Sequence, residues 1–178
     1  MTEVDIERAE QRYRPPYLAA ALAACAVLAL YVLTLAPTTA FWDTSEYIAT
    51  AHILGIPHPP GNPLFVVLGK AWSILLAPLG LSVAVRINLL AAVTSAVASG
   101  FLYLVAHRVL IALFEDRWCA IVGAVASTIL GATAFTVWNQ SNVNEKVYTI
   151  SVLVIAWVTW LAILWHDRKD DPGSERYL

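Results

Sequence analysis

The chain has 178 residues, of which 59% are hydrophobic and 13% are charged, and its formal net charge is −2. Soluble domains carry about 25% charged residues, so this composition indicates an integral membrane protein with the lipid bilayer as its surroundings. The slightly negative charge and the lack of a basic stripe argue against nucleic acid as a partner. The two cysteines lie far apart and have no neighbouring histidines, which favours neither a disulfide nor a zinc site.

Four apolar runs are long enough to cross a bilayer, for which a helix needs ~20 mostly apolar residues. They are Pro16–Ala36, Val83–Ala106, Trp118–Trp138 and Val147–Trp165. The first run is longer than the apolar core of a typical signal peptide, so we interpret it as a retained span. The chain is therefore predicted to be all-α, a transmembrane helical bundle over residues 16–166. The polar segments 1–15 and 167–178 flank this bundle.

The segment Leu64–Leu79 is apolar but short, and it is either a fifth span or a helix that lies in the membrane interface. Cytoplasmic flanks are enriched in Lys and Arg, so the charge distribution separates the two alternatives. With four spans, eight of these residues lie inside and three outside, whereas five spans, with Lys70 inside a span, give five on each side. The inner set is Arg8, Arg12, Arg14, Arg108, Arg117, Arg168, Lys169 and Arg176, and the outer set is Lys70, Arg86 and Lys146. We therefore expect four spans, with both termini cytoplasmic in a cell (inner) membrane protein.

The long loop 37–82 is then extracytoplasmic. We expect it to carry two helices parallel to the membrane, roughly Trp42–Leu54 and Pro63–Ala77. The residues between them, Gly55–Asn62, include three prolines and two glycines and cannot form a regular helix. This loop holds the densest group of candidate functional residues in the chain.

Asp43 and Glu46 are three residues apart, so on a helix they share a face. One interpretation is a general base with a supporting carboxylate. The other is a capping box, in which Asp43 is the N-cap residue and Glu46 bonds back to its backbone. The spacing is compatible with both.

His58 lies between prolines, and it either holds the turn by hydrogen bonding or takes part in the chemistry. Arg86 either extends its charged end to the interface or binds a lipid phosphate. Glu145 and Lys146 precede the fourth run, where they either mark its end or pair with groups on the loop. These residue types and spacings match no strong zinc pattern, so no metal ligand is predicted, although a divalent metal is not excluded.

Two motifs in the loop resemble a known family. They are Trp42-Asp-Thr-Ser-Glu-Tyr-Ile-Ala-Thr-Ala51 and Leu54-Gly-Ile-Pro-His-Pro-Pro-Gly-Asn-Pro-Leu-Phe65, and Arg86-Ile-Asn-Leu-Leu90 and Trp138–Tyr148 fit the next two landmarks. The family is a large group of membrane proteins of unknown function. It is similar to protein O-mannosyltransferases and belongs to the GT-C glycosyltransferases.

This resemblance implies a GT-C fold with interfacial helices in the first extracytoplasmic loop. It also implies transfer of a sugar, with mannose as one candidate, from a polyprenyl-phosphate donor to an extracytoplasmic acceptor such as a protein Ser or Thr. Asp43 matches the acidic base of that loop, with Glu46 as the second catalytic residue. The candidate substrate-binding residues are His58, Lys70, Arg86, Glu145, Lys146 and Tyr148. GT-C enzymes have many more spans, so we expect the chain to be the amino-terminal part of such a protein, working with a carboxy-terminal part. The alternative is a non-catalytic membrane scaffold or lipid-binding subunit.

Overall fold

The computed structural model describes residues 13–40, 42–144, 147–169 and 177. Within these ranges all regular structure is helical, which confirms the all-α prediction for this part of the chain. The helices are α2 (Tyr17–Leu33), α3 (Thr44–Ile53), α4 (Pro63–Leu75), the 3-10 helix η1 (Ala77–Leu79), α5 (Val83–Phe114), α6 (Arg117–Thr133), α7 (Phe135–Asn142) and α8 (Tyr148–Arg168).

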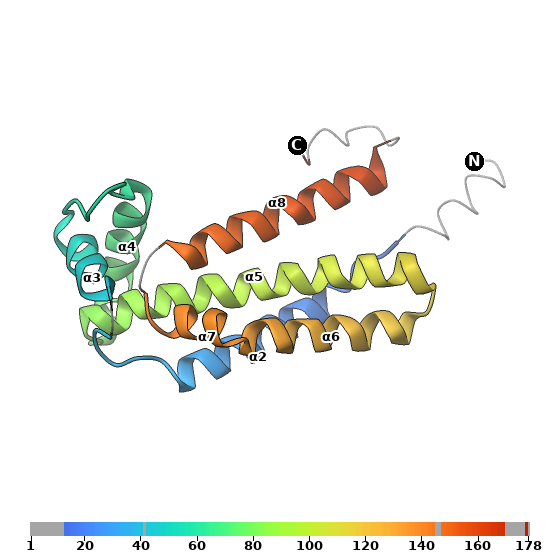
Figure 1. The fold of residues 1–178 in the computed structure, drawn as a ribbon, viewed down its shortest axis with the longest axis horizontal. Coiled ribbons are helices and arrows are strands. Elements are labelled where there is room, and N and C mark those ends of the chain that lie inside the picture. Colours follow the sequence, from blue (N-terminus) through green and yellow to red (C-terminus); the bar gives the residue numbers. More distant parts are fainter. Residues whose placement is uncertain (1–12, 41, 145–146, 170–176, 178) are drawn as a thin grey trace.

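The long helix α5 is the centre of the molecule, and α2, α6 and α8 pack along it (Figure 1). Helices α3 and α4 lie together at one end of α5. The beginning of α2 and the end of α8 lie near the other end, where the rings of Tyr17 and Trp160 meet edge to face with centroids 6.2 Å apart. The α3–α4 pair therefore lies at the opposite end from both described ends of the chain.

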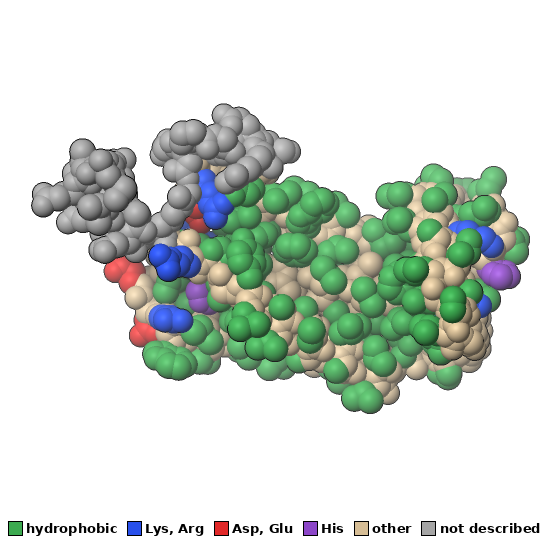
Figure 2. Space-filling view, turned by 180° about the vertical axis from the view of Figure 1, so that it is seen from behind, with side chains coloured by type: hydrophobic (Ala, Val, Ile, Leu, Met, Phe, Trp, Pro, Cys, Tyr) green, Lys and Arg blue, Asp and Glu red, His purple; other side chains and the backbone are tan. Residues whose placement is uncertain are grey.

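Two helices, α5 and α8, are long and apolar enough to cross a membrane by length and composition, and the bent pair α6–α7 would count as a third among the described residues. Helix α2 is apolar but has only 17 residues. Figure 2 shows hydrophobic side chains over the long helices, with charged side chains gathered toward the two ends of the molecule. These features support a membrane protein, while the count of four spans stays a prediction.

The predicted third run, Trp118–Trp138, is not one continuous helix. Helix α6 ends at Thr133, Ala134 has extended backbone angles, and α7 continues at 64° to α6. Polar contacts hold α7 in this direction: the Trp138 indole N–H donates to Thr34 Oγ1 of the α2 C-cap, and the Ser141 hydroxyl donates to Ser95 of α5. Hydropathy does not detect such a bend, because the residues on both sides of it are apolar.

The turn between α5 and α6 is short and capped on both sides. Glu115 ends α5 in the left-handed backbone region, at φ 54°, and the Asp116 carboxylate accepts a hydrogen bond of 2.8 Å from the Cys119 backbone at the start of α6. Left-handed C-caps and acidic N-caps satisfy backbone groups that a helix end otherwise leaves unpaired. The cap at Glu115 lies nine residues beyond the predicted end of the second span, so α5 extends farther than its most apolar part.

Helices α3 and α4 form a small hairpin that packs against the start of α5. Its buried core contains Tyr47, Ile48, Ala51, Phe65, Val66, Ile87 and Leu90. Helix α4 has 13 residues, which corresponds to about 20 Å and is too short for the ~30 Å hydrocarbon core. This length favours the two-helix loop over a fifth span. The location of the hairpin in a membrane interface stays a prediction.

Candidate functional site

Asp43 and Glu46 lie at the start of α3, but they do not form the capping box that their spacing allows. Asp43 occupies the N-cap position, yet no side-chain hydrogen bond caps the helix there. Glu46 directs both carboxylate oxygens to His58 instead. The capping-box interpretation is therefore wrong, and the two carboxylates remain on one side of α3 beside the loop that follows it.

His58 is held by Glu46 through two hydrogen bonds. The His58 backbone N–H donates to Oε1, and the ring Nδ1 lies 2.7 Å from Oε2. On the other side of the ring, Nε2 lies 3.7 Å from Oδ2 of Asp43. The hydrogen bonds from His58 hold the pKa of the Glu46 carboxyl below its ordinary value. Asp43, Glu46 and His58 form what we call the acid–histidine cluster.

Buried Tyr47 supports the loop that carries His58. Tyr47 is not among the candidate residues predicted from the sequence. Tyr47 is 1% exposed, its ring meets the His58 ring edge to face at 6.0 Å, and its hydroxyl accepts a hydrogen bond of 2.6 Å from the Asn62 side chain. The Gly61 N–H donates to the His58 carbonyl at 3.0 Å and closes the turn. The position of Tyr47 directly after Glu46 is the sequence feature that could have predicted this packing role.

Gly61 has φ +82°, a backbone conformation that side chains disfavour. We expect Gly61→Ala to reduce the free energy of unfolding by about 1–2 kcal/mol, because the left-handed region brings Cβ close to the following carbonyl. Thermal unfolding in detergent would measure the loss. The matched control is Gly131→Ala, where no atom lies within 4 Å of the added Cβ and φ is unstrained. That helical substitution should be neutral or stabilise by up to ~1 kcal/mol. Equal effects of the two substitutions would contradict the strained turn.

Lys70 and Arg86, two predicted substrate contacts, bind backbone carbonyls in this structure. The Lys70 ammonium donates to the carbonyl of His52 near the end of α3. The Arg86 guanidinium donates to the carbonyl of Ser73 at 2.6 Å, and the Trp72 indole N–H donates back to the Arg86 carbonyl. Both cations thus join α4 to its neighbours rather than entering the acid–histidine cluster.

The predicted residues Glu145 and Lys146 lie outside the described residues. Tyr148 begins α8 and is 48% exposed. It contributes to the edge of a groove described below, not to the acid–histidine cluster.

Asn88 of α5 joins three segments of the chain. It is fully buried, and its amide N–H₂ donates to the carbonyls of Ala36 and Thr38, while its Oδ1 accepts from the backbone N–H of Asn144. The segment that leads into α3 and the segment that leads toward α8 are therefore tied to one side chain of α5. An asparagine within the apolar run Val83–Ala106 is the sequence feature that could have indicated a buried hydrogen-bonding role.

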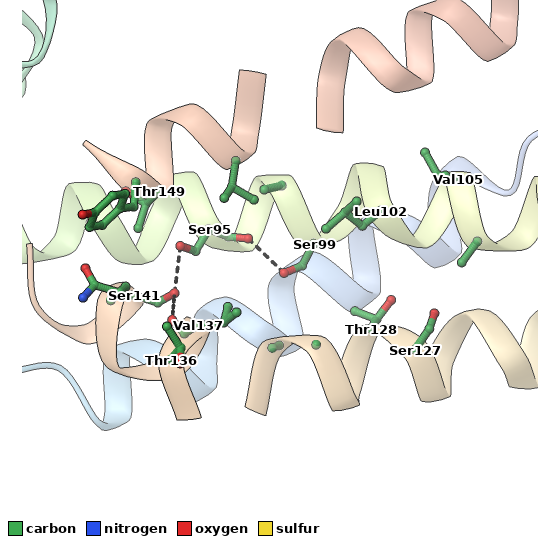
Figure 3. A pocket seen from close by; sticks show the side chains of 17 residues that line it. Ser95, Ser99, Leu102, Val105, Ser127, Thr128, Thr136, Val137, Ser141 and Thr149 are labelled. Atoms are coloured by element: carbon green, nitrogen blue, oxygen red, sulfur yellow. Dashed lines mark hydrogen bonds between the residues drawn. The ribbon is translucent and has the colours of Figure 1, made fainter. Parts of the chain in front are cut away.

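A groove of about 760 Å³ lies along α5, with α6 and α7 on one side and α8 on the other. Figure 3 shows the serines and threonines that line it, including Ser95, Ser99, Thr128 and Ser141. These four hydroxyls are hydrogen bonded within the chain, Ser99 to the Ser95 carbonyl, Thr128 to the Ala124 carbonyl and Ser141 to Ser95. The groove therefore presents a largely apolar surface despite its polar residue types.

The acid–histidine cluster also brings three possible metal ligands together, because one ligand atom from each residue lies within 4.8 Å of the others. However, both Glu46 oxygens and Nδ1 of His58 are already engaged with each other. An ion bound to Nδ1 would have to break this pair, whereas an ion bound to Nε2 and Asp43 would not. We assign no metal ligands here, and the arrangement is better suited to moving a proton.

Comparison with known proteins identifies related sequences. The sequence model described as "Protein O-mannosyl-transferase TMEM260 N-terminal domain" matches residues 43–178. The chain is 28% identical to the protein O-mannosyl-transferase tmem260 of Dictyostelium discoideum over 148 residues, which is 83% of this chain and 17% of that protein. It is 33% identical to protein O-mannosyl-transferase TMEM260 of Mus musculus over 141 residues, which is 77% of this chain and 18% of that protein.

The matched part thus spans less than a fifth of the length of these curated relatives. No solved structure matches the chain. The family match begins at Asp43 and includes the whole acid–histidine cluster.

Proposed function

Because the chain belongs to the family of protein O-mannosyl-transferase TMEM260 N-terminal domains, we propose that it is the amino-terminal part of a GT-C-type glycosyltransferase. The donor is a polyprenyl-phosphate sugar, with mannose as the first candidate. The acceptor is an extracytoplasmic hydroxyl, with protein Ser or Thr as the first candidate. The observation that carries the proposal is the acid–histidine cluster, in which a carboxylate lies beside an exposed imidazole at the end of a membrane-type bundle.

In this proposal Asp43 is the general base. The acceptor hydroxyl lies against Asp43, and its oxygen attacks the anomeric carbon as the carboxylate takes its proton. The new carbon–oxygen bond forms while the bond to phosphate breaks, and the lipid phosphate leaves with the electron pair. A positioned base of this kind contributes roughly 10²–10⁴-fold to the rate. Since Lys70 and Arg86 already bind carbonyls, Lys146 is the preferred partner for the departing phosphate, with Tyr148 nearby in the chain.

The direct test is sugar transfer by the full-length protein in detergent or vesicles. Radiolabelled mannosyl-phosphoryl-polyprenol is supplied with a Ser/Thr-containing acceptor peptide, and labelled peptide is counted. Transfer that depends on the lipid-linked donor supports the proposal. If no label reaches the peptide from this donor, while the protein remains folded, the proposed donor or acceptor is wrong.

The second candidate is a non-catalytic lipid-binding subunit, and the groove beside α5 favours it. The hydroxyls of Ser95, Ser99, Thr128 and Ser141 are satisfied internally, and the groove's volume of about 760 Å³ is within the ~300–1,000 Å³ typical of small-molecule sites. Such a groove suits a hydrocarbon chain. Saturable binding of a polyprenyl phosphate without any transfer would favour this candidate over the enzyme.

The proposed location of the acid–histidine cluster is the extracytoplasmic side. We expect a single cysteine at Ile56, which is 89% exposed, to react with an impermeant maleimide in intact cells. A single cysteine at Phe114, at the other end of α5, should react only after permeabilisation. Both variants require a background without Cys25 and Cys119. The reverse pattern would place the cluster in the cytoplasm.

A further inference from the structure

The hydrogen bonds of Glu46 determine which nitrogen of His58 is available. An ionised carboxylate can only accept hydrogen bonds, and Oε1 already accepts one from the His58 backbone. The short contact between Oε2 and Nδ1 therefore places the ring hydrogen of a neutral imidazole on Nδ1. Nε2 then carries the lone pair, and this atom is the one that faces Asp43.

Nε2 and Oδ2 of Asp43 are two proton acceptors 3.7 Å apart. This separation exceeds a direct hydrogen bond, but a small shift of either side chain or one water molecule closes it. Among the described contacts, the charged groups against His58 are Asp43 and Glu46, while Tyr47 offers only its ring. The ammonium of Lys70 donates to the His52 carbonyl. A proton that reaches Asp43 therefore has a second acceptor beside it.

We propose that His58 is a catalytic proton acceptor behind Asp43, positioned by Glu46. The proposal rests on the glycosyltransferase function proposed above. The acceptor oxygen forms its bond to the anomeric carbon, the bond to phosphate breaks with its electron pair, and the hydroxyl proton passes through Asp43 to Nε2. The product is an imidazolium between two carboxylates. It then releases the proton to water, because the His58 side chain is 41% exposed.

The second proton step rests on the position of Nε2 beside Asp43. Nε2 is a neutral nitrogen with a free lone pair, and an imidazolium formed there would contact the Glu46 carboxylate. A proton delivered to the imidazole therefore leaves Asp43 ionised and ready for the next acceptor. Glu46 contributes by fixing the ring orientation and by stabilising the imidazolium, as the carboxylate does in an acid–histidine–nucleophile triad.

Kinetics of the full-length protein test this role. We expect His58→Gln to lower kcat for mannosyl transfer by about 10²-fold with little change in KM, and to remove a protonation from the acidic side of the pH–rate profile. His58→Ala should recover activity when free imidazole is added, because the site is open to solvent. His52→Gln, on the exposed side of α3, is the matched control and should behave like the unmodified protein. A His58→Gln variant with the normal rate and pH profile would overturn the proposal.

A second measurement does not depend on activity. Ring nitrogen-15 spectra of the histidine-labelled chain in micelles should show His58 with its hydrogen on Nδ1 at neutral pH, assigned by the signal that His58→Gln removes. Glu46→Gln should disturb that signal. A hydrogen on Nε2 would overturn the proposal. If the unmodified protein transfers no sugar, the proposed function fails and the catalytic role of His58 fails with it. If Asp43→Asn is inactive and His58→Gln is not, only the role of His58 fails.

Discussion

Replacement of Asp43 by Asn should lower sugar transfer by the full-length protein by 10²-fold or more and leave its thermal stability almost unchanged. Asn is nearly isosteric with Asp and equally good at a helix N-cap, but it cannot take a proton. The structure sharpens this expectation, because Asp43 makes no side-chain cap bond that the substitution could remove. Initial rates from the labelled lipid donor, together with unfolding temperatures of both proteins, measure the two quantities.

Glu46→Gln is the companion to this substitution. Its amide oxygen can still accept one hydrogen bond from His58, whereas Glu46 accepts two. We therefore expect a smaller loss of activity than for Asp43→Asn. A near-normal rate for Asp43→Asn would move the base to another residue, with Glu46 and Glu145 as the remaining carboxylates of the two motifs.

Asn88→Leu should cause the largest loss of stability among the substitutions considered. It leaves two carbonyls and the buried N–H of Asn144 without their partner. The unsatisfied buried N–H of Asn144 costs about 1–3 kcal/mol, and the two part-buried carbonyls add less because water can replace their partner, so we expect a total of about 2–3 kcal/mol. Thermal unfolding of the 178-residue chain in detergent would show a clear decrease in Tm.

The control for Asn88→Leu is Thr94→Val on the same helix. Thr94 is also buried, but its hydroxyl only donates to carbonyls of its own helix, those of Leu90 and Ala91. Removal of this hydroxyl should cost less than ~1 kcal/mol. If the two variants unfold at the same temperature, Asn88 does not hold the neighbouring segments as the structure indicates.

Much of the helical framework was accessible from composition and local chemistry. The predicted start of the second span at Val83 is the first residue of α5, and the prolines of Gly55–Asn62 separate α3 from α4 as expected. Pro63 begins α4 at the position where proline costs a helix no hydrogen bond. The bend at Ala134 was not accessible, because it depends on contacts of α7 with α2 and α5 that no local pattern records.

The sequence identified all three residues of the acid–histidine cluster as candidates, but it did not predict the contacts between their side chains. Spacing alone placed Asp43 and Glu46 on one face of a helix, and it was equally compatible with a capping box. The eleven residues between Glu46 and His58 return the chain so that the carboxylate binds the imidazole. This pairing depends on the shape of the turn and on the packing of Tyr47 beneath it, which are properties of the folded loop.

By itself, the sequence determined that this is an apolar helical protein with polar ends and with a small group of candidate functional residues in one loop, because hydropathy and proline positions act locally. It also indicated candidate residues for the chemistry, through residue types that apolar surroundings tolerate only at a cost. Only the tertiary structure decided that Lys70 and Arg86 bind backbone carbonyls, that Asn88 joins three segments, and that Glu46 turns Nε2 of His58 toward Asp43. The physical reason is that a hydrogen bond depends on distance and direction between groups far apart in the chain, and these are defined only once the helices have packed.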